Sequence, residues 1–132
     1  MDHETFKSLP EPVALVVDDE PLILMDTSDI MANVGYHVIE ARNADEAFEF
    51  LKQHSSLKLV FTDIQMPGEI DGIELAHHIA NRWPAIKVIV ASGAVRPAPG
   101  VLPESATFLN KPISVQLVHQ TLKEYFGQTM GV

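Results

Sequence analysis

Short apolar runs alternate along the chain with stretches whose apolar residues recur every three or four positions. The short runs are typical of strands covered on both faces, and they lie at residues 13–17, 36–41, 58–62, 86–91 and 106–109. The longer stretches predict amphipathic helices at residues 21–34, 43–54, 71–83 and 114–126. This alternation favours an α/β fold, in which helices cover both faces of a doubly wound parallel sheet with right-handed connections.

Local signals mark the ends of these helices. Pro21 suits the first turn of the first helix, and Gly35 suits its C-terminal stop. Asn43 with Glu46 resembles a capping box at the start of the second helix. We expect the first helix to turn an apolar stripe inward, made of Leu22, Leu24, Met25, Ile30, Met31 and Val34. We expect the same of the last helix, which Gly127 ends, with Val115, Leu117, Val118, Leu122, Tyr125 and Phe126.

Residues 94–105 break the alternation, because they carry three prolines and a glycine where the pattern requires a fourth helix. A proline within a helix costs roughly 3 kcal/mol. We therefore expect this helix to be missing or reduced to a turn or two. A short helix that begins at Pro97 or Pro99 is the alternative, since proline is tolerated in a first turn.

The 132 residues suit one domain, predicted at 13–127 between a loose extension at 1–12 and a tail at 128–132. No apolar run approaches the roughly 20 residues that span a bilayer, and the N-terminus lacks the pattern of a signal peptide. With no cysteine there is no disulfide, which fits the cytoplasm. The net charge of −9 disfavours direct nucleic-acid binding.

Polar side chains follow four of the predicted strands. They are the acidic pair Asp18 and Asp19, then Asp63, Ser92 and Lys111. Alone, each has an ordinary structural explanation as a helix cap, a turn residue or a loop lysine. Together they are more informative, because the carboxyl ends of parallel strands share one edge of the sheet, where open α/β sheets bind ligands.

Three carboxylates at one edge repel one another, by about 4 kcal/mol per pair at 4 Å and an effective dielectric of 20. Hard oxygen ligands without cysteine favour Mg²⁺ or a similar divalent ion. Such an ion leaves Asp63 able to attack a phosphoryl group, while Lys111 and Ser92 can contact phosphoryl oxygens. These residues therefore predict an aspartyl phosphate site.

Residues 13–127 resemble the receiver domain of two-component response regulators. The resemblance rests on the ordered set of an acidic pair, Asp-x-x-Met-Pro-Gly, Ser-Gly and Lys-Pro. It implies the flavodoxin-like fold with strand order 2-1-3-4-5. It also implies that Asp63 is the phosphoacceptor, that Asp19 binds Mg²⁺ directly and Asp18 mainly through water, and that the backbone carbonyl of Gln65 completes the protein ligands.

The resemblance assigns further roles near the same edge. Ser92 matches the switch hydroxyl, Lys111 the phosphate-binding lysine, Pro112 its usual cis-proline partner, and Phe108 the aromatic residue that turns inward on activation. It implies a signalling domain that catalyses only its own phosphorylation and dephosphorylation. The phosphoryl donor would be a sensor histidine kinase or a phosphotransfer protein, and a downstream protein would receive the signal.

Two departures from the family pattern affect the expected output. The family uses its fourth helix for output and dimerisation, so a missing helix suggests another surface, such as the first or last helix. No output domain follows Val132, which suggests a stand-alone receiver that binds a partner, relays phosphoryl groups or drains them from a kinase. Gln65 and Ala94 occupy the positions that tune phosphoryl hydrolysis in the family.

Other functions remain open from the residues alone. A magnesium-dependent phosphatase would carry a second acid two residues after its nucleophile, where this chain has Gln65. A pure interaction module would not need the full acidic, hydroxyl and lysine set. A flavodoxin-like nucleotide binder would need a phosphate loop after the first strand. His77 and His78 point about 100° apart on a helix and do not suit one metal, and we expect His37, His54 and His119 at the surface.

Overall fold

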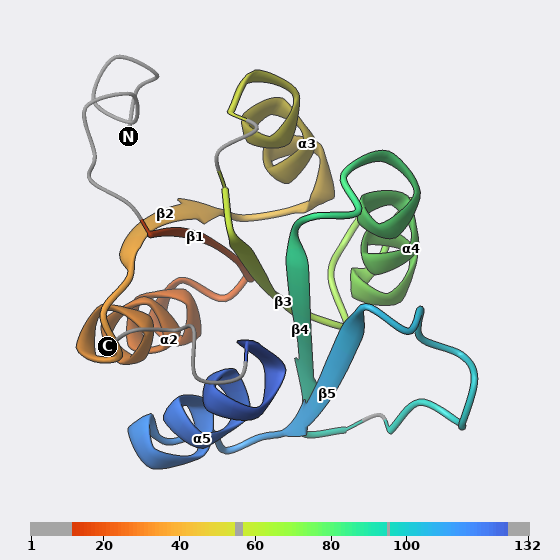
Figure 1. The fold of residues 1–132 in the computed structure, drawn as a ribbon. Helices are drawn as coiled ribbons and strands as arrows, with labels where there is room; N and C mark the ends of the chain where they lie inside the picture. The colour runs from red at the N-terminus through yellow and green to blue at the C-terminus, as the bar shows by residue number, and fades with distance from the viewer. Residues whose placement is uncertain (1–11, 55–56, 95, 127–132) are drawn as a thin grey trace.

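The computed structural model describes residues 12–54, 57–94 and 96–126, and its sheet confirms the predicted architecture. Five parallel strands follow the order β2-β1-β3-β4-β5 (Figure 1). Their bounds are β1 Val13–Val17, β2 His37–Ala41, β3 Leu59–Asp63, β4 Lys87–Ser92 and β5 Ala106–Asn110. They differ from the predicted bounds by at most one residue at each end.

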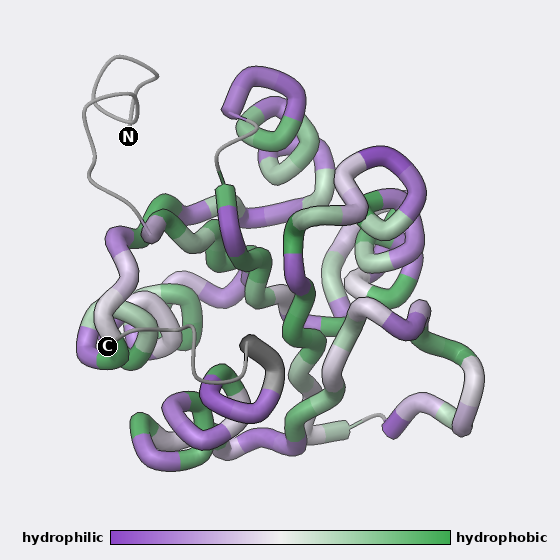
Figure 2. The backbone as a smooth tube through the Cα atoms, viewed as in Figure 1, coloured by the Kyte–Doolittle hydropathy of each residue, from purple (hydrophilic) through white to green (hydrophobic). Residues whose placement is uncertain are grey.

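Helices cover both faces of this sheet, as the alternating pattern predicted. Their bounds are α2 Pro21–Asn33, α3 Ala44–Gln53, α4 Gly72–Arg82 and α5 Val115–Phe126. Figure 1 shows α2 and α5 on one face, with α3 and α4 on the other. Each face has its own apolar core, and Figure 2 shows the apolar residues concentrated in the strands between them.

The register of the strands brings their carboxyl ends to one edge of the sheet. Every residue of β1 is buried, because helices cover both of its faces. Val17 lies opposite Thr62, Asp63 opposite Ala91, and Ser92 opposite Asn110. The carboxyl ends of β1, β3, β4 and β5 therefore meet at the same edge.

The predicted stripe of the first helix is partly wrong. Leu24 is buried, but Leu22 is 75% exposed and Met25 55% exposed. The residues that do face the core are spaced three or four apart and include Thr27 in place of Met25. Leu22 lies two positions before Leu24, about 200° around the helix, and this places it on the outer side.

The stripe of the last helix needs a similar correction. Val118 and Leu122 are buried as predicted, whereas Val115 and Leu117 are exposed. Thr121 takes an inner position, since it lies three residues after Val118. The side chains of Tyr125 and Phe126, and the predicted stop at Gly127, lie outside the described residues.

Two local predictions around α3 also differ from the structure. Asn43 caps the helix by accepting a hydrogen bond from the Glu46 backbone N–H at 2.9 Å. The Glu46 carboxylate, however, accepts from Arg42 N–H rather than completing a capping box with Asn43. His54 is buried instead of exposed: it caps the C-terminus of α3, and its ring lies 6.1 Å from that of Phe50.

The connection between β4 and β5 contains no helix at its described residues, 93–94 and 96–105, which confirms the prediction from its prolines. The alternative of a short helix that begins at Pro97 or Pro99 is wrong over this range. A turn forms instead, in which Val101 N–H donates to Ala98 C=O and Gly100 takes a φ of 84°.

Candidate functional site

The strand ends bring the predicted polar residues together. Asp63 is the last residue of β3 and Ser92 the last of β4, while Lys111 follows β5 directly. Asp18 follows β1, and its backbone N–H extends the sheet by donating to Ala41 C=O at 3.1 Å. This backbone bond holds Asp18 at the edge, where only 4% of its surface is exposed.

Lys111 joins two of the acids. Its ammonium Nζ donates to Asp63 Oδ1 at 2.9 Å and to Asp18 Oδ2 at 3.3 Å. The exposed fractions of the three side chains are 20%, 14% and 6%, so water screens this contact less than it would a surface pair. The second Asp18 oxygen, Oδ1, accepts from Glu20 N–H at 3.0 Å, which orients the carboxylate.

The acids form a group that suits a divalent cation. Asp18, Asp19 and Asp63 each offer a carboxylate oxygen, and these oxygens lie within 4.8 Å of one another. Lys111 contributes one positive charge against three negative charges. The donors are hard oxygens, which Mg²⁺ prefers, so the residues fit such an ion on both charge and ligand chemistry.

Burial and charge act on the pKa of this pair in different ways. Burial raises the pKa of Asp63 above its ordinary value, although the hydrogen bond and the charge of Lys111 lower it in part. Burial lowers the pKa of Lys111, but its contacts with Asp63 and Asp18 outweigh burial and raise that pKa overall. The acids therefore favour the charged form of Lys111, whereas burial of Asp63 outweighs its contact with Lys111 and disfavours the ionised carboxylate.

Ser92 lies beside the acids in the sheet, because Ala91 is the register partner of Asp63. Its side chain is buried, and its hydroxyl accepts from Ala94 N–H at 3.2 Å. Lys111 N–H donates to Ser92 C=O at 3.1 Å, which ties the end of β4 to the end of β5.

Phe108 lies two residues before the end of β5 and is half-buried against the core. The guanidinium of Arg96 lies 5.5 Å from the centre of its ring. Gln65 is exposed in the loop after Asp63, and the Lys111–Pro112 peptide bond is cis, as the resemblance implies.

Two residues that position the backbone of Asp63 were not predicted from the sequence. The buried Thr62 hydroxyl donates to Asp63 C=O at 2.9 Å. Gly72 N–H donates to Ile64 C=O at 2.8 Å, and a Cβ at position 72 would overlap the carbonyl oxygen of Asp63. Both hold the backbone that carries Asp63. A glycine after a helix cap gives no hint of so close a contact between distant backbone segments.

Comparison with known proteins then settles the family. The family model for the response regulator receiver domain matches residues 14–123. The chain belongs to this family. Receiver domains are signalling domains that interact with histidine kinases or phosphotransfer proteins, and they bind Mg²⁺ in an acidic pocket. The cluster of Asp18, Asp19 and Asp63 fits such a pocket.

Curated relatives of this receiver domain are longer proteins. The transcriptional regulatory protein ComA of Bacillus subtilis strain 168 is 32% identical over 81 residues, which cover 60% of this chain and 38% of ComA. The sensor kinase CckA of Brucella abortus strain 2308 is 34% identical over 114 residues, which cover 83% of this chain and 12% of CckA. This receiver domain thus spans less than half the length of these relatives.

A similar solved structure is that of the response regulator TrrA from Thermotoga maritima, in complex with Mg²⁺-BeF. It is 27% identical with a TM-score of 0.77, and the match covers 87% of this chain and 99% of that one. Within the described part of this receiver domain, no helix has the length and apolar character that crossing a membrane requires.

Proposed function

We propose that this receiver domain accepts a phosphoryl group on Asp63 from a phosphohistidine, in a reaction that depends on Mg²⁺. The observation that carries the proposal is the position of the Asp63 carboxylate at the tip of β3. There it lies 2.9 Å from the Lys111 ammonium and within 4.8 Å of the oxygens of Asp18 and Asp19. A half-buried carboxylate among these groups is suited to hold a phosphoryl group and its charge.

In the proposed step, an Asp63 carboxylate oxygen attacks the phosphorus and forms an O–P bond. The P–N bond to the donor imidazole breaks, and the imidazole nitrogen keeps the electron pair and takes a proton from solvent. Lys111 Nζ, which now contacts Asp63 Oδ1, then donates to a phosphoryl oxygen. The Ser92 hydroxyl donates to another oxygen once it leaves its contact with Ala94.

Asp19 and Asp63 would hold Mg²⁺ directly, Asp18 mainly through water, and Gln65 through its backbone carbonyl. The ion supplies positive charge that stabilises the phosphoryl oxygens during transfer. The acids of this chain would keep that charge next to Asp63, and Lys111 adds a second positive charge, 2.9 Å from Asp63 Oδ1.

Phosphorylation would shift an existing equilibrium between two conformations. Ser92 would move toward the phosphoryl group, and Phe108 would turn further inward behind it. Half-burial of Phe108 supports this role, because the ring packs against the core and is still partly exposed. The exposed Arg96, whose guanidinium lies 5.5 Å from the centre of the Phe108 ring, would have to move as well.

The donor would be a sensor histidine kinase or phosphotransfer protein in the cytoplasm, and a downstream protein would receive the signal. Such a donor needs a docking surface beside Asp63. The first turns of α2, which follow Asp18 and Asp19, expose the apolar side chains of Leu22, Ile23 and Met25 and would suit it.

Intact mass after incubation with acetyl phosphate tests the proposal. We expect the wild-type chain to gain one phosphoryl group when Mg²⁺ is present and none after chelation. Asp63→Asn should not gain it under either condition, because its amide is not a nucleophile of comparable strength. Asp26→Asn, which changes an exposed acid on α2, is the matched control and should behave as wild type.

A gain of mass in Asp63→Asn equal to that of wild type would contradict the assignment of Asp63. A gain that persists fully after chelation would contradict the dependence on Mg²⁺. Absence of any gain in the wild-type chain, with Mg²⁺ binding demonstrated separately, would favour an interaction module.

A further inference from the structure

The edge strand β2 has backbone groups that no other strand of the described chain uses. His37 N–H donates to Pro12 C=O, and Ala41 C=O accepts from Asp18 N–H, so these residues point toward β1. Backbone groups alternate in direction along a strand. The N–H and C=O groups of Val38 and Glu40 therefore point away from the sheet.

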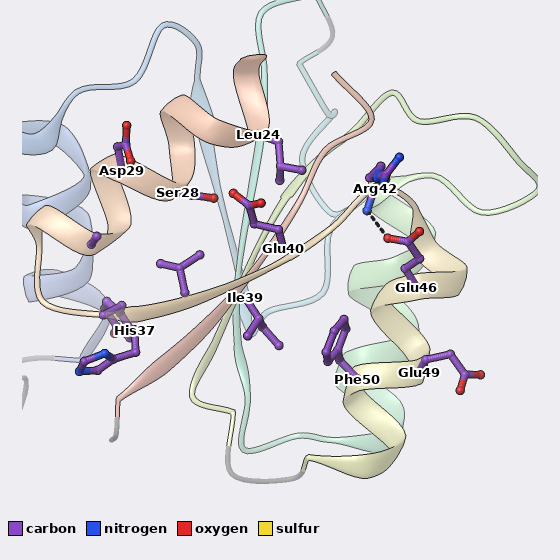
Figure 3. Close-up of a pocket in the computed structure, with 13 residues that line it drawn as sticks. Leu24, Ser28, Asp29, His37, Ile39, Glu40, Arg42, Glu46, Glu49 and Phe50 are labelled. Atoms are coloured by element: carbon purple, nitrogen blue, oxygen red, sulfur yellow. Dashed lines mark hydrogen bonds between the residues drawn. The ribbon is translucent and has the colours of Figure 1, made fainter. Parts of the chain in front are cut away.

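A groove of about 750 Å³ runs along this open edge. Figure 3 shows its two walls, with Leu24, Ser28 and Asp29 of α2 on one side and Glu46, Glu49 and Phe50 of α3 on the other. The side chains of β2 divide between the walls. Val38 packs on the core under α2 and Ile39 on the core under α3. Ile39 is already buried, so an added strand would meet the half-buried side chains of Val38 on the α2 side and Phe50 on the α3 side.

The rim of this groove is acidic. Its exposed carboxylates come from three elements, namely Asp29 of α2, Glu40 of β2, and Glu46 and Glu49 of α3. Arg42 is the one arginine or lysine among the lining residues. Glu46 also accepts from Arg42 N–H at 2.9 Å, which caps the backbone of the edge beyond Glu40. The open stretch is therefore short and surrounded by negative charge.

We propose that the β2 edge binds an extended, basic segment of a partner protein as a sixth strand. Its backbone would pair with Val38 and Glu40. Basic side chains would face Asp29 and Glu40 on the α2 side, and apolar ones would face Phe50 on the α3 side. A second copy of this chain fits poorly, because its own β2 would bring the same carboxylates against these.

An octapeptide of alternating lysine and valine is the probe, and hydrogen exchange of the β2 amides in the full chain is the readout. In the free protein the Val38 and Glu40 amides should exchange quickly, whereas the Ile39 amide, which the register pairs with β1, should be protected. The peptide should protect Val38 and Glu40, with a Kd below ~1 mM that rises with salt.

Variants at one position separate the charge from the backbone donor. Glu40→Pro removes an outward N–H without touching the bonds to β1, and should weaken binding about fivefold to tenfold, as expected for one lost hydrogen bond. Glu40→Gln keeps the N–H and should weaken binding less while lowering its salt dependence. Glu104→Gln changes an exposed acid outside the groove and is the control.

The peptide itself gives a test that needs no variant to fold. N-methylation of its alternate residues on the pairing side should abolish protection of Val38 and Glu40, and a glutamate–valine peptide should not bind. The proposal would be overturned by equal binding of the acidic peptide, by protection confined to other amides, or by no binding at millimolar peptide. A dimer that Glu40→Pro dissociates would overturn it too, since a second copy would then cover the edge.

Discussion

Two connections leave the same edge of the sheet and are built in opposite ways. The β3–α4 connection follows Asp63, and its backbone is held by the Thr62 hydroxyl, which donates to Asp63 C=O, and by Gly72 N–H, which donates to Ile64 C=O. The β4–β5 connection follows Ser92 and has no helix in its described residues. Most of these residues are exposed, and their contacts include one turn bond, from Val101 N–H to Ala98 C=O, and the exposed side chain of His77, whose Nε2 lies 2.6 Å from Val101 C=O.

This difference separates two tasks at one site. The connection after Asp63 fixes the nucleophile, because a shift of its backbone would break contacts with Thr62, Ile64 and Gly72. The connection after Ser92 can rearrange at lower cost, since few of its residues are buried. A switch that moves Ser92 while Asp63 stays in place requires this asymmetry. The predictions that follow test it from its strongest element to its weakest.

The largest effect is expected at Gly72, where a Cβ would overlap the Asp63 carbonyl. Gly72→Ala must push apart two backbone segments, and we expect it to lower the free energy of unfolding by about 3 kcal/mol. Gly93→Ala in the other connection is the matched control, because its Cβ would meet only Lys111 Cβ, at an ordinary 3.6 Å. We expect a change within about 0.5 kcal/mol there.

Urea unfolding of both variants measures this contrast. The transition should stay cooperative, so that the two midpoints are comparable. Equal loss of stability in Gly72→Ala and Gly93→Ala would contradict the view that the β3–α4 connection is the rigid one. A stable Gly72→Ala variant would show that this backbone can yield.

The next prediction concerns the charge of the Asp63 carboxylate, which lies at the start of the β3–α4 connection. Burial raises the pKa of Asp63, so its ionisation disfavours the folded state. The corresponding stability is present at low pH and is lost as the pH rises through the raised pKa. Asp63→Asn should therefore be more stable than wild type at pH 7 without metal, by roughly 1 kcal/mol, the scale of one weakly screened charge interaction.

Two conditions should remove or reverse this gain. The gain of Asp63→Asn should vanish as the pH falls below the ordinary aspartate pKa, where the folded and unfolded wild-type chains are both protonated at Asp63. Saturating Mg²⁺ should stabilise wild type by about 2.7 kcal/mol at a concentration of 100 Kd, which exceeds the gain of the variant and reverses the order of the two proteins. Denaturant midpoints over pH and Mg²⁺, with Asp26→Asn as control, measure both. A gain independent of pH would show that the carboxylate charge does not strain the fold.

The sequence predicted the residues of the site better than the packing contacts that hold them in place. Convergence of Asp18, Asp63 and Lys111 followed from parallel topology alone, since any such sheet collects its strand ends at one edge. The missing helix followed from proline chemistry. The contact between Gly72 and the Asp63 backbone could not be predicted, because it depends on how two distant segments pack. Exposure of Leu22 and Met25 had the same cause, since apolar spacing cannot tell which side of a helix meets the core.

The smallest effect is expected where the β4–β5 connection contacts α4. The Val101 carbonyl accepts from His77 Nε2, while the ring of the neighbouring His78 lies 5.5 Å from that of Phe48, nearly perpendicular to it. His77→Ala should leave global stability within about 1 kcal/mol, since an exposed hydrogen bond contributes little. It should nevertheless free the turn in which Val101 N–H donates to Ala98 C=O. Hydrogen exchange at the Val101 amide should rise about fivefold, which corresponds to one weak hydrogen bond.

Two neighbouring substitutions make this measurement specific. His77→Gln keeps a donor that can reach the carbonyl and should restore most of the protection, whereas His78→Ala should leave the Val101 amide unchanged. If His77→Ala instead lowered the protection of the amides of β3 as strongly as that of Val101, the β4–β5 connection would be part of the rigid framework. The assignment of fixed and movable sides at this site would then be wrong, and a switch through Ser92 would have to move Asp63 as well.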